Sequence, residues 1–216
     1  MSIFISVATV SCSSSAGGDD GGCDSVMRSY VAQGKVQYLD GDYNSALSTL
    51  HKVLAAMESA PGTAPAPGDL QNTYLMLGNI HFAFGDYVRA NKYYLEGLKS
   101  ARKSGDSGNE LIFLNDLAVV ACFLGNRDEA MRYNEELALL NAADSLQQKY
   151  FHMITSAYIE QTFGNRDRAI VQMKRSLGFI DRNDLDPLLK LSPLSEISEY
   201  FEQKNMYDSA VIYLQD

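Results

Sequence analysis

The sequence lacks the features that mark disulfide-stabilised, metal-binding and membrane-spanning proteins. Three cysteines are too few for a disulfide framework, and three histidines lie far apart without metal-ligand spacing. No apolar run approaches the roughly eighteen residues that a membrane-spanning helix needs. What is present is a chain of 216 residues with 46 % hydrophobic content, which is enough for one domain with a continuous core.

Basic residues are also scarce, which limits the possible partners. The chain has 18 lysines and arginines against 27 acidic residues, so the formal net charge is −9. Nucleic acids and anionic membrane surfaces require a positive face on the protein, and no basic cluster is longer than Lys174-Arg175. We therefore expect no nucleic-acid partner, and contact with a membrane only through a lipid anchor.

Common catalytic motifs are missing as well. The sequence contains no His-Glu-x-x-His, no Gly-x-Ser-x-Gly, no phosphate-binding loop and no Cys-x-x-Cys. The charged segments at 166–168 and 181–184 are interpreted as solvated helix ends. We therefore expect a protein without enzymatic activity, cofactor, bound metal or small-molecule substrate.

The first 24 residues differ in composition from the rest. An apolar stretch from Met1 to Val10 precedes Ser11 and Cys12, and a segment rich in Ser, Gly and Asp follows. This arrangement resembles the end of a bacterial lipoprotein signal peptide, in which the cysteine becomes the lipidated N-terminus. The resemblance implies lipidation of Cys12, a flexible tether after it, and a place in the bacterial cell envelope, facing the periplasm or the exterior.

Two features depart from such a signal. The segment before Cys12 has no Lys or Arg, and only eleven residues precede the cysteine. A start codon placed too far downstream would account for both departures. The alternative is a frayed N-terminal tail with an incidental cysteine, in which case we expect a cytoplasmic protein.

One short pattern recurs along the rest of the chain. It consists of Gly, Asp or Asn, and Tyr or Arg, with an alanine three residues later. The alanines are Ala46, Ala90, Ala130, Ala169 and Ala210, separated by 44, 40, 39 and 41 residues. Twelve residues before each alanine stands a small residue, in chain order Gly34, Gly78, Ala118, Ala157 and Ser198. Small residues on either side of a turn allow two antiparallel helices to cross closely, so the pattern predicts about five helix–turn–helix repeats.

The turn residues have a physical explanation. Gly adopts the left-handed conformation that closes the first helix, and the Asp or Asn after it caps the second helix. The fifth copy has Asn205, which tolerates the left-handed conformation, and Met206, which is a poor cap. Apolar residues at i, i+3, i+4 and i+7 predict helices on both sides of the turns.

The pattern predicts ten helices and no β-strand. The expected ranges are 25–40, 43–59, 70–84, 87–103, 109–124, 127–141, 145–163, 166–180, 193–204 and 207–216. A linker rich in Ala, Pro and Gly at 60–68 explains the longer first spacing. We expect residues 1–24 to form the signal and tether, and residues 25–216 to form one all-α domain whose last repeat is incomplete.

The pattern resembles the tetratricopeptide repeat (TPR), most closely from Leu77 to Ala90. It departs from that family in its period near 40 rather than 34, in the missing fifth Gly, and in the absence of a final Pro from most repeats. The resemblance implies an α-solenoid that winds as a right-handed superhelix. It also implies a concave groove, lined by the first helix of each repeat and used to bind a protein or peptide.

The same resemblance implies which side chains face this groove. They stand one and four residues after the small residue of the first helix, and Asn115 three residues before Ala118 faces the same way. The rule also gives Val119, Cys122 and Gln161, and the six candidates that we select are Lys35, Tyr38, Asn79, Phe82, Asn115 and Tyr158. For the apolar candidates, packing between repeats is the alternative.

The sequence therefore predicts a non-enzymatic scaffold that binds a partner protein or peptide. The alternative is the N-terminal sensory or regulatory half of a longer membrane signalling protein that carries a kinase or a transcription regulator. That alternative rests on the apolar residues of the last helix, Val211, Ile212, Tyr213 and Leu214, because a solenoid normally ends in a helix with a polar outer face.

Overall fold

The computed structural model describes residues 23–59, 65–140 and 145–215. Of these residues 86 % are helical, and no strand occurs among them. Among the helices that the structure describes, none combines the length and the apolar character that a membrane-spanning segment requires. The predicted lipidation site, Cys12, lies outside the described residues.

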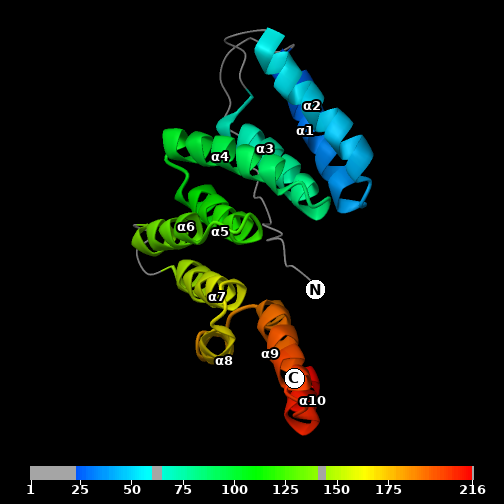
Figure 1. Cartoon of the computed structure of the whole chain (residues 1–216). Coiled ribbons are helices and arrows are strands. Elements are labelled where there is room, and N and C mark those ends of the chain that lie inside the picture. The colour runs from blue at the N-terminus through cyan, green and yellow to red at the C-terminus, as the bar shows by residue number, and fades with distance from the viewer. Residues whose placement is uncertain (1–22, 60–64, 141–144, 216) are drawn as a thin grey trace. The chain divides into compact units, whose positions relative to one another are not determined.

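Ten α-helices follow one another through the described residues, in consecutive packed pairs (Figure 1). The first five are α1 (Cys23–Leu39), α2 (Tyr43–Ser59), α3 (Pro67–Ala83), α4 (Tyr87–Ser104) and α5 (Ser107–Phe123). The others are α6 (Arg127–Leu139), α7 (Leu146–Thr162), α8 (Arg166–Arg182), α9 (Leu191–Gln203) and α10 (Tyr207–Gln215). The predicted all-α repeat fold is confirmed, and the second helix of every pair begins at the predicted residue.

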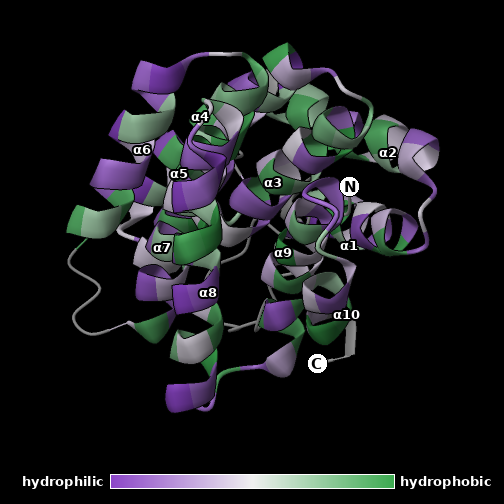
Figure 2. Cartoon of the chain, turned by 60° about the horizontal axis from the view of Figure 1, so that its bottom comes forward, coloured by the Kyte–Doolittle hydropathy of each residue, from purple (hydrophilic) through white to green (hydrophobic). Residues whose placement is uncertain are grey.

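The chain divides into two compact parts. The N-terminal part ends at Phe113, and the C-terminal part runs from Leu114 to Asp216, so the division falls within α5. Hydrophobic residues from consecutive helix pairs form the core inside each part (Figure 2). In the N-terminal part, Val31, Ala46 and Leu50 cluster with residues of α3 such as Leu77 and Ile80.

The turn between the two helices of each pair takes the predicted backbone conformation. The first four turns contain a Gly with positive φ, at Gly41, Gly85, Gly125 and Gly164. In the fifth turn Asn205 has a φ of 58°, so it adopts the left-handed conformation in place of Gly. The prediction that these positions close the first helices is therefore confirmed.

Side-chain caps follow three of these turns. Asp42 accepts a hydrogen bond from the Ser45 N–H, Asp86 from the Arg89 N–H and Asn126 from the Glu129 N–H. Asn165 makes no such bond, so the prediction of a side-chain cap is wrong for α8. The three bonds satisfy N–H groups that have no partner inside their own helix.

The small residues of the first helices lie where the paired helices approach closely. A Cβ added to Gly34 would lie 2.7 Å from Leu50 Cδ2, and one added to Gly78 would lie 2.3 Å from Tyr94 Cε1. In the fifth repeat, the Ser198 hydroxyl donates to the Ala210 carbonyl at 3.3 Å. Each glycine is thus covered by the residue four positions after the repeat alanine.

Some details were not predicted. Helix α3 starts at Pro67 rather than at residue 70, because proline at the first helical position supplies the required φ. A 3₁₀-helix, η1 (Pro187–Lys190), precedes α9. Gly97 of α4 is a further point of close approach, since a Cβ added there would lie 2.2 Å from Phe113 Cζ.

Side-chain hydrogen bonds link consecutive repeats, and their partners are about one repeat apart in sequence. In the N-terminal part, Asn79 bonds Tyr38 across 41 residues and Asn109 bonds Gln71 across 38 residues. In the C-terminal part, Thr155 bonds Asn115 across 40 residues and Gln161 bonds Glu196 across 35 residues. These bonds therefore join each repeat to the one beside it.

Candidate binding face

The first helices of the N-terminal part carry four of the six predicted groove residues. Lys35 is exposed and Tyr38 is half-buried, so both side chains are available at the surface of α1. Asn79 and Phe82 are only 3 % and 7 % exposed. The structure therefore separates the four predicted residues into an accessible pair on α1 and a buried pair on α3.

Asn79 has its amide group engaged inside the protein. The Tyr94 hydroxyl donates to Asn79 Oδ1 at 2.7 Å, and Asn79 Nδ2 donates to the Tyr38 hydroxyl at 3.3 Å. Phe82 packs edge-on against Tyr87 with 5.3 Å between the ring centroids. In this structure Asn79 and Phe82 hold helices together, in contrast to the expected role of contacting a ligand.

The first helices of the C-terminal part bring the other two predicted residues to one surface. Asn115 of α5 and Tyr158 of α7 are both half-buried. Thr155 Oγ1 donates to Asn115 Oδ1 at 2.7 Å, and the Tyr158 ring lies 6.2 Å from that of Phe123. Because neighbouring side chains restrain both residues, they present an amide and a phenol in fixed positions. We call Asn115 and Tyr158, on α5 and α7 of the C-terminal part, the first-helix face.

A buried acid lies next to this surface. Asp116 is 8 % exposed, and its Oδ1 accepts a hydrogen bond from Asn115 Nδ2 at 3.1 Å. Its Oδ2 is buried and has no hydrogen-bond partner among the described residues. Burial raises the pKa of Asp116 from 3.8 to about 7, and the hydrogen bond from Asn115 offsets only part of this effect.

The fold brings together two histidines that are distant in sequence. The His81 ring stacks on Tyr93 at 5.4 Å, and the His51 ring approaches the same tyrosine edge-on at 6.2 Å. Burial lowers the pKa of His81, and the Asp86 carboxylate 3.6 Å away offsets part of that effect. Throughout the ranges that the structure describes, no group of three or more His, Cys, Asp and Glu side chains is arranged to hold a metal ion.

Sequence reasoning did not identify Asp116. The available signal was an acid inside an otherwise apolar segment that runs from Leu111 to Leu124 and is interrupted by only two polar residues, Asn115 and Asp116. The helical period alone could not show that Asp116 is buried. The network of Asn79 with Tyr38 and Tyr94 was also missed, because its members are 15 and 41 residues apart.

Comparison with known proteins identifies the fold. No family model matches the sequence, and no curated protein is similar to it in sequence. Solved structures are similar in shape. One is the crystal structure of BtubC (BKLC) from P. vanneervenii, with a TM-score of 0.64 and 17 % identity over 89 % of this chain and 78 % of that one. Another is a putative kinesin light chain from P. anserina with nearly identical TPR-like repeats, with a TM-score of 0.62 and 15 % identity over 90 % and 94 % of the two chains.

Proposed function

Because the chain has a TPR-like repeat fold, we propose that it is a non-enzymatic scaffold that binds a partner protein or peptide through the first-helix face. The observation that carries this proposal is that Asn115 on α5 and Tyr158 on α7 are both half-buried and each restrained by a neighbouring side chain. A restrained aromatic side chain offers a large contact area at a small entropic cost.

The chemistry of the face favours an extended or helical peptide. The Asn115 amide bonds Thr155 and Asp116, but it is half-buried, and its oxygen and its NH₂ group each keep capacity for one further hydrogen bond to a peptide backbone. Tyrosine presents an apolar ring with a polar tip. In the N-terminal part, the accessible pair on α1, Lys35 and Tyr38, offers a positive charge and a phenol of its own. Such a mixed surface makes little demand on the partner's sequence beyond an apolar residue for the rings and free backbone groups.

Replacing Tyr158 by Ala is expected to weaken partner binding by about 1–2 kcal/mol, or roughly 5- to 30-fold in Kd, because it removes the aromatic anchor. The partner is first isolated by pull-down from a cell-envelope extract, and its affinity for the purified variants is then measured by calorimetry. Leu139→Ala is the control, because Leu139 is a large side chain that is 79 % exposed and lies on α6 rather than on this face.

A stability measurement accompanies this test. If Tyr158→Ala lowers the melting temperature, Tyr158→Phe replaces it, because it removes the polar tip of the side chain while leaving the packed ring in place. Folded variants that bind the partner as tightly as the wild type would place the contact elsewhere on the chain.

We also propose that Cys12 is lipidated and anchors the protein in the bacterial envelope. The support is the apolar stretch before Ser11-Cys12 and the polar segment after it. Metabolic labelling with a fatty-acid analogue in the native host is expected to label the wild type and to leave Cys12→Ala unlabelled. Equal labelling of both chains, or of neither, would contradict the anchor.

A further inference from the structure

Two histidines meet one tyrosine where the first repeat packs against the second. His51 lies on α2, His81 on α3 and Tyr93 on α4, so three helices from two repeats contribute one ring each. The His81 ring stacks on Tyr93 with 5.4 Å between the ring centroids and 21° between the planes. The His51 ring approaches the same tyrosine edge-on at 6.2 Å. We call these three side chains the histidine junction.

The two histidines differ in their access to water. His51 is exposed, whereas His81 is only 7 % exposed. The His81 Nδ1 atom faces Asp86 Oδ2 at 3.6 Å, so the neutral ring carries its proton on Nδ1. The Nε2 atom of His81 is buried and has no hydrogen-bond partner among the described residues. The junction therefore accommodates His81 in its uncharged form.

A second proton on His81 would have no acceptor. Protonation turns Nε2 into an N–H donor with a positive charge, at a place where neither water nor a protein oxygen meets it. Burying an unpaired donor, and above all a charged one, costs free energy. Burial accordingly lowers the pKa of His81 from its ordinary value of 6.5.

The charged and titratable groups around His81 offset only part of this cost. They are Asp86, Arg89 and Tyr93 from the start and the middle of α4, and His51 from α2. The Asp86 carboxylate favours a charged His81, but its Oδ2 also lies 3.1 Å from the Arg89 guanidinium and its Oδ1 accepts the Arg89 N–H. Arg89 and His51 both disfavour a further positive charge. The one nearby acid is thus already engaged by an arginine.

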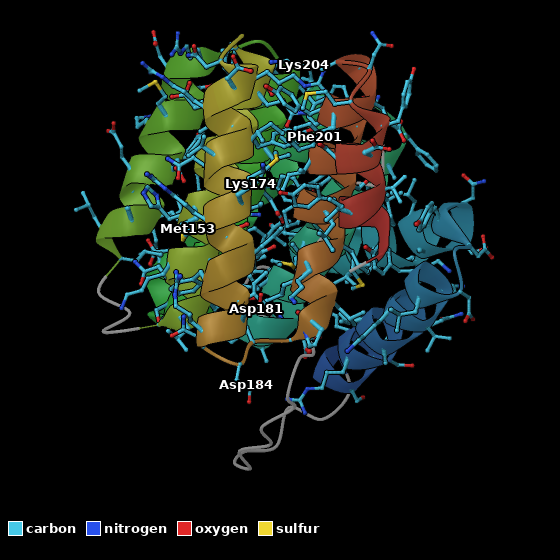
Figure 3. All side chains as sticks on the ribbon, turned by 90° about the horizontal axis from the view of Figure 1, so that it is seen from below. Met153, Lys174, Asp181, Asp184, Phe201 and Lys204 are labelled. Carbon is cyan, nitrogen blue, oxygen red and sulfur yellow. The ribbon has the colours of Figure 1, made fainter. Side chains whose placement is uncertain are left out.

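A cation beside an aromatic ring is stable elsewhere in the protein because water reaches it. In the C-terminal part, the ammonium group of Lys174 on α8 lies 4.7 Å from the centre of the Phe201 ring on α9, and both residues are labelled in Figure 3. Lys174 is exposed, so its charge contacts the ring and stays hydrated. A protonated His81 gains the same hydration only when the helices around it move apart.

We propose that the histidine junction is a pH-sensitive contact between the first two repeats, which loosens when acid protonates His81. The open state binds one more proton than the closed state once the pH falls below about 6.5, so the free energy of opening falls with the pH. The loosening extends to α1, because Asn79, two residues before His81, donates a hydrogen bond to the Tyr38 hydroxyl. This proposal is independent of the first-helix face.

The test compares wild type with His81→Phe, which keeps a ring against Tyr93 and cannot be protonated. Amide hydrogen exchange of the full chain is measured by mass spectrometry at about pH 7.5 and about pH 5.5 and corrected for the intrinsic rates. Protection of residues 43–59 and 67–83 is expected to fall at least about threefold more in the wild type than in the variant at the lower pH. His51→Phe is the matched control, because His51 meets the same tyrosine from an exposed position, and it is expected to keep the response of the wild type.

Two outcomes of this comparison would overturn the proposal. Equal pH responses in the wild type and His81→Phe would show that His81 is not the sensor. A response that His51→Phe abolishes as completely would assign the effect to the exposed ring. Circular dichroism at the higher pH checks that each variant is folded.

A second measurement applies if His81→Phe does not fold. The His81 ring of the wild type is then followed by NMR as the pH falls. A ring that stays uncharged until the protection of α2 and α3 is lost supports the proposal. A ring that takes up its proton near pH 6.5 while both helices stay protected would contradict it.

Discussion

Replacing Asp116 by Asn is expected to stabilise the protein at pH 8 and to give no such gain at pH 4. The carboxyl group is buried, and burial raises its pKa from 3.8 to about 7. Folded protein therefore keeps the proton up to about pH 7, whereas the unfolded chain loses it near pH 4. An asparagine at this position keeps the acceptor for Asn115 Nδ2 and does not titrate.

The direction of the pH dependence follows from the protons bound in each state. Between about pH 4 and pH 7 the folded state binds one more proton than the unfolded state, so the free energy of unfolding falls as the pH rises. A pKa difference of about three units corresponds to roughly 4 kcal/mol, because each unit is worth about 1.4 kcal/mol. This loss of unfolding free energy is complete above about pH 7 and absent below about pH 4.

Urea unfolding at pH 4 and at pH 8 measures this effect. The difference in unfolding free energy between Asp116→Asn and the wild type is expected to change by about 4 kcal/mol in favour of the variant from the lower to the higher pH. Asp128→Asn, at an exposed position, is the control and is expected to show little change at either pH. An Asp116 variant whose difference from the wild type is the same at both pH values would show that the carboxyl group is not held protonated.

Replacing Gly78 by Ala is expected to destabilise the protein by about 2–3 kcal/mol. The added Cβ would lie 2.3 Å and 2.5 Å from two carbons of the Tyr94 ring. That ring cannot yield easily, because it is 2 % exposed and its hydroxyl is bonded to Asn79. The cost of overpacking exceeds the roughly 1 kcal/mol that alanine gains over glycine within a helix.

Two other glycines provide matched controls for this substitution. Gly68 lies in the same helix with no atom within 4 Å of an added Cβ, so Gly68→Ala is expected to be neutral or slightly stabilising. At Gly34 the added Cβ would meet Leu50 Cδ2 at 2.7 Å, which is the end of a more adaptable side chain. The expected order of melting temperatures is therefore Gly68→Ala highest, then Gly34→Ala, then Gly78→Ala. Equal melting temperatures for all three would contradict close helix packing at the small residues.

The helical framework could be predicted because its signals are local. A Gly or Asn in the left-handed conformation and a following cap lie within three residues of each other, so Gly85 and Asp86 fix the start of α4 by themselves. The small residues twelve positions before each alanine also follow from simple helix geometry. The 3₁₀-helix at Pro187–Lys190 has no repeat counterpart, which is why the pattern gave no indication of it.

The candidate site was predicted less completely, because the burial of a side chain in a repeat array depends on the helices that pack around it. Lys35 and Asn79 occupy the same position relative to their small residue, but only Asn79 has helices packed around it. Its burial depends on Tyr38 and Tyr94, which are 41 and 15 residues away. A residue's position in the helical period gives its direction, whereas its exposure is set by partners that the period does not identify.

The hydrogen bonds that join consecutive repeats, such as Tyr38 with Asn79 and Asn115 with Thr155, also bear on how the chain folds. Their partners are 41 and 40 residues apart, so forming them closes loops of a single repeat. The entropy of loop closure rises only slowly with length, and proteins dominated by short-range contacts fold quickly. Each repeat can therefore pack against the one before it as soon as it has itself left the ribosome. This order of assembly limits the time for which the apolar residues of an unpaired repeat are exposed to aggregation.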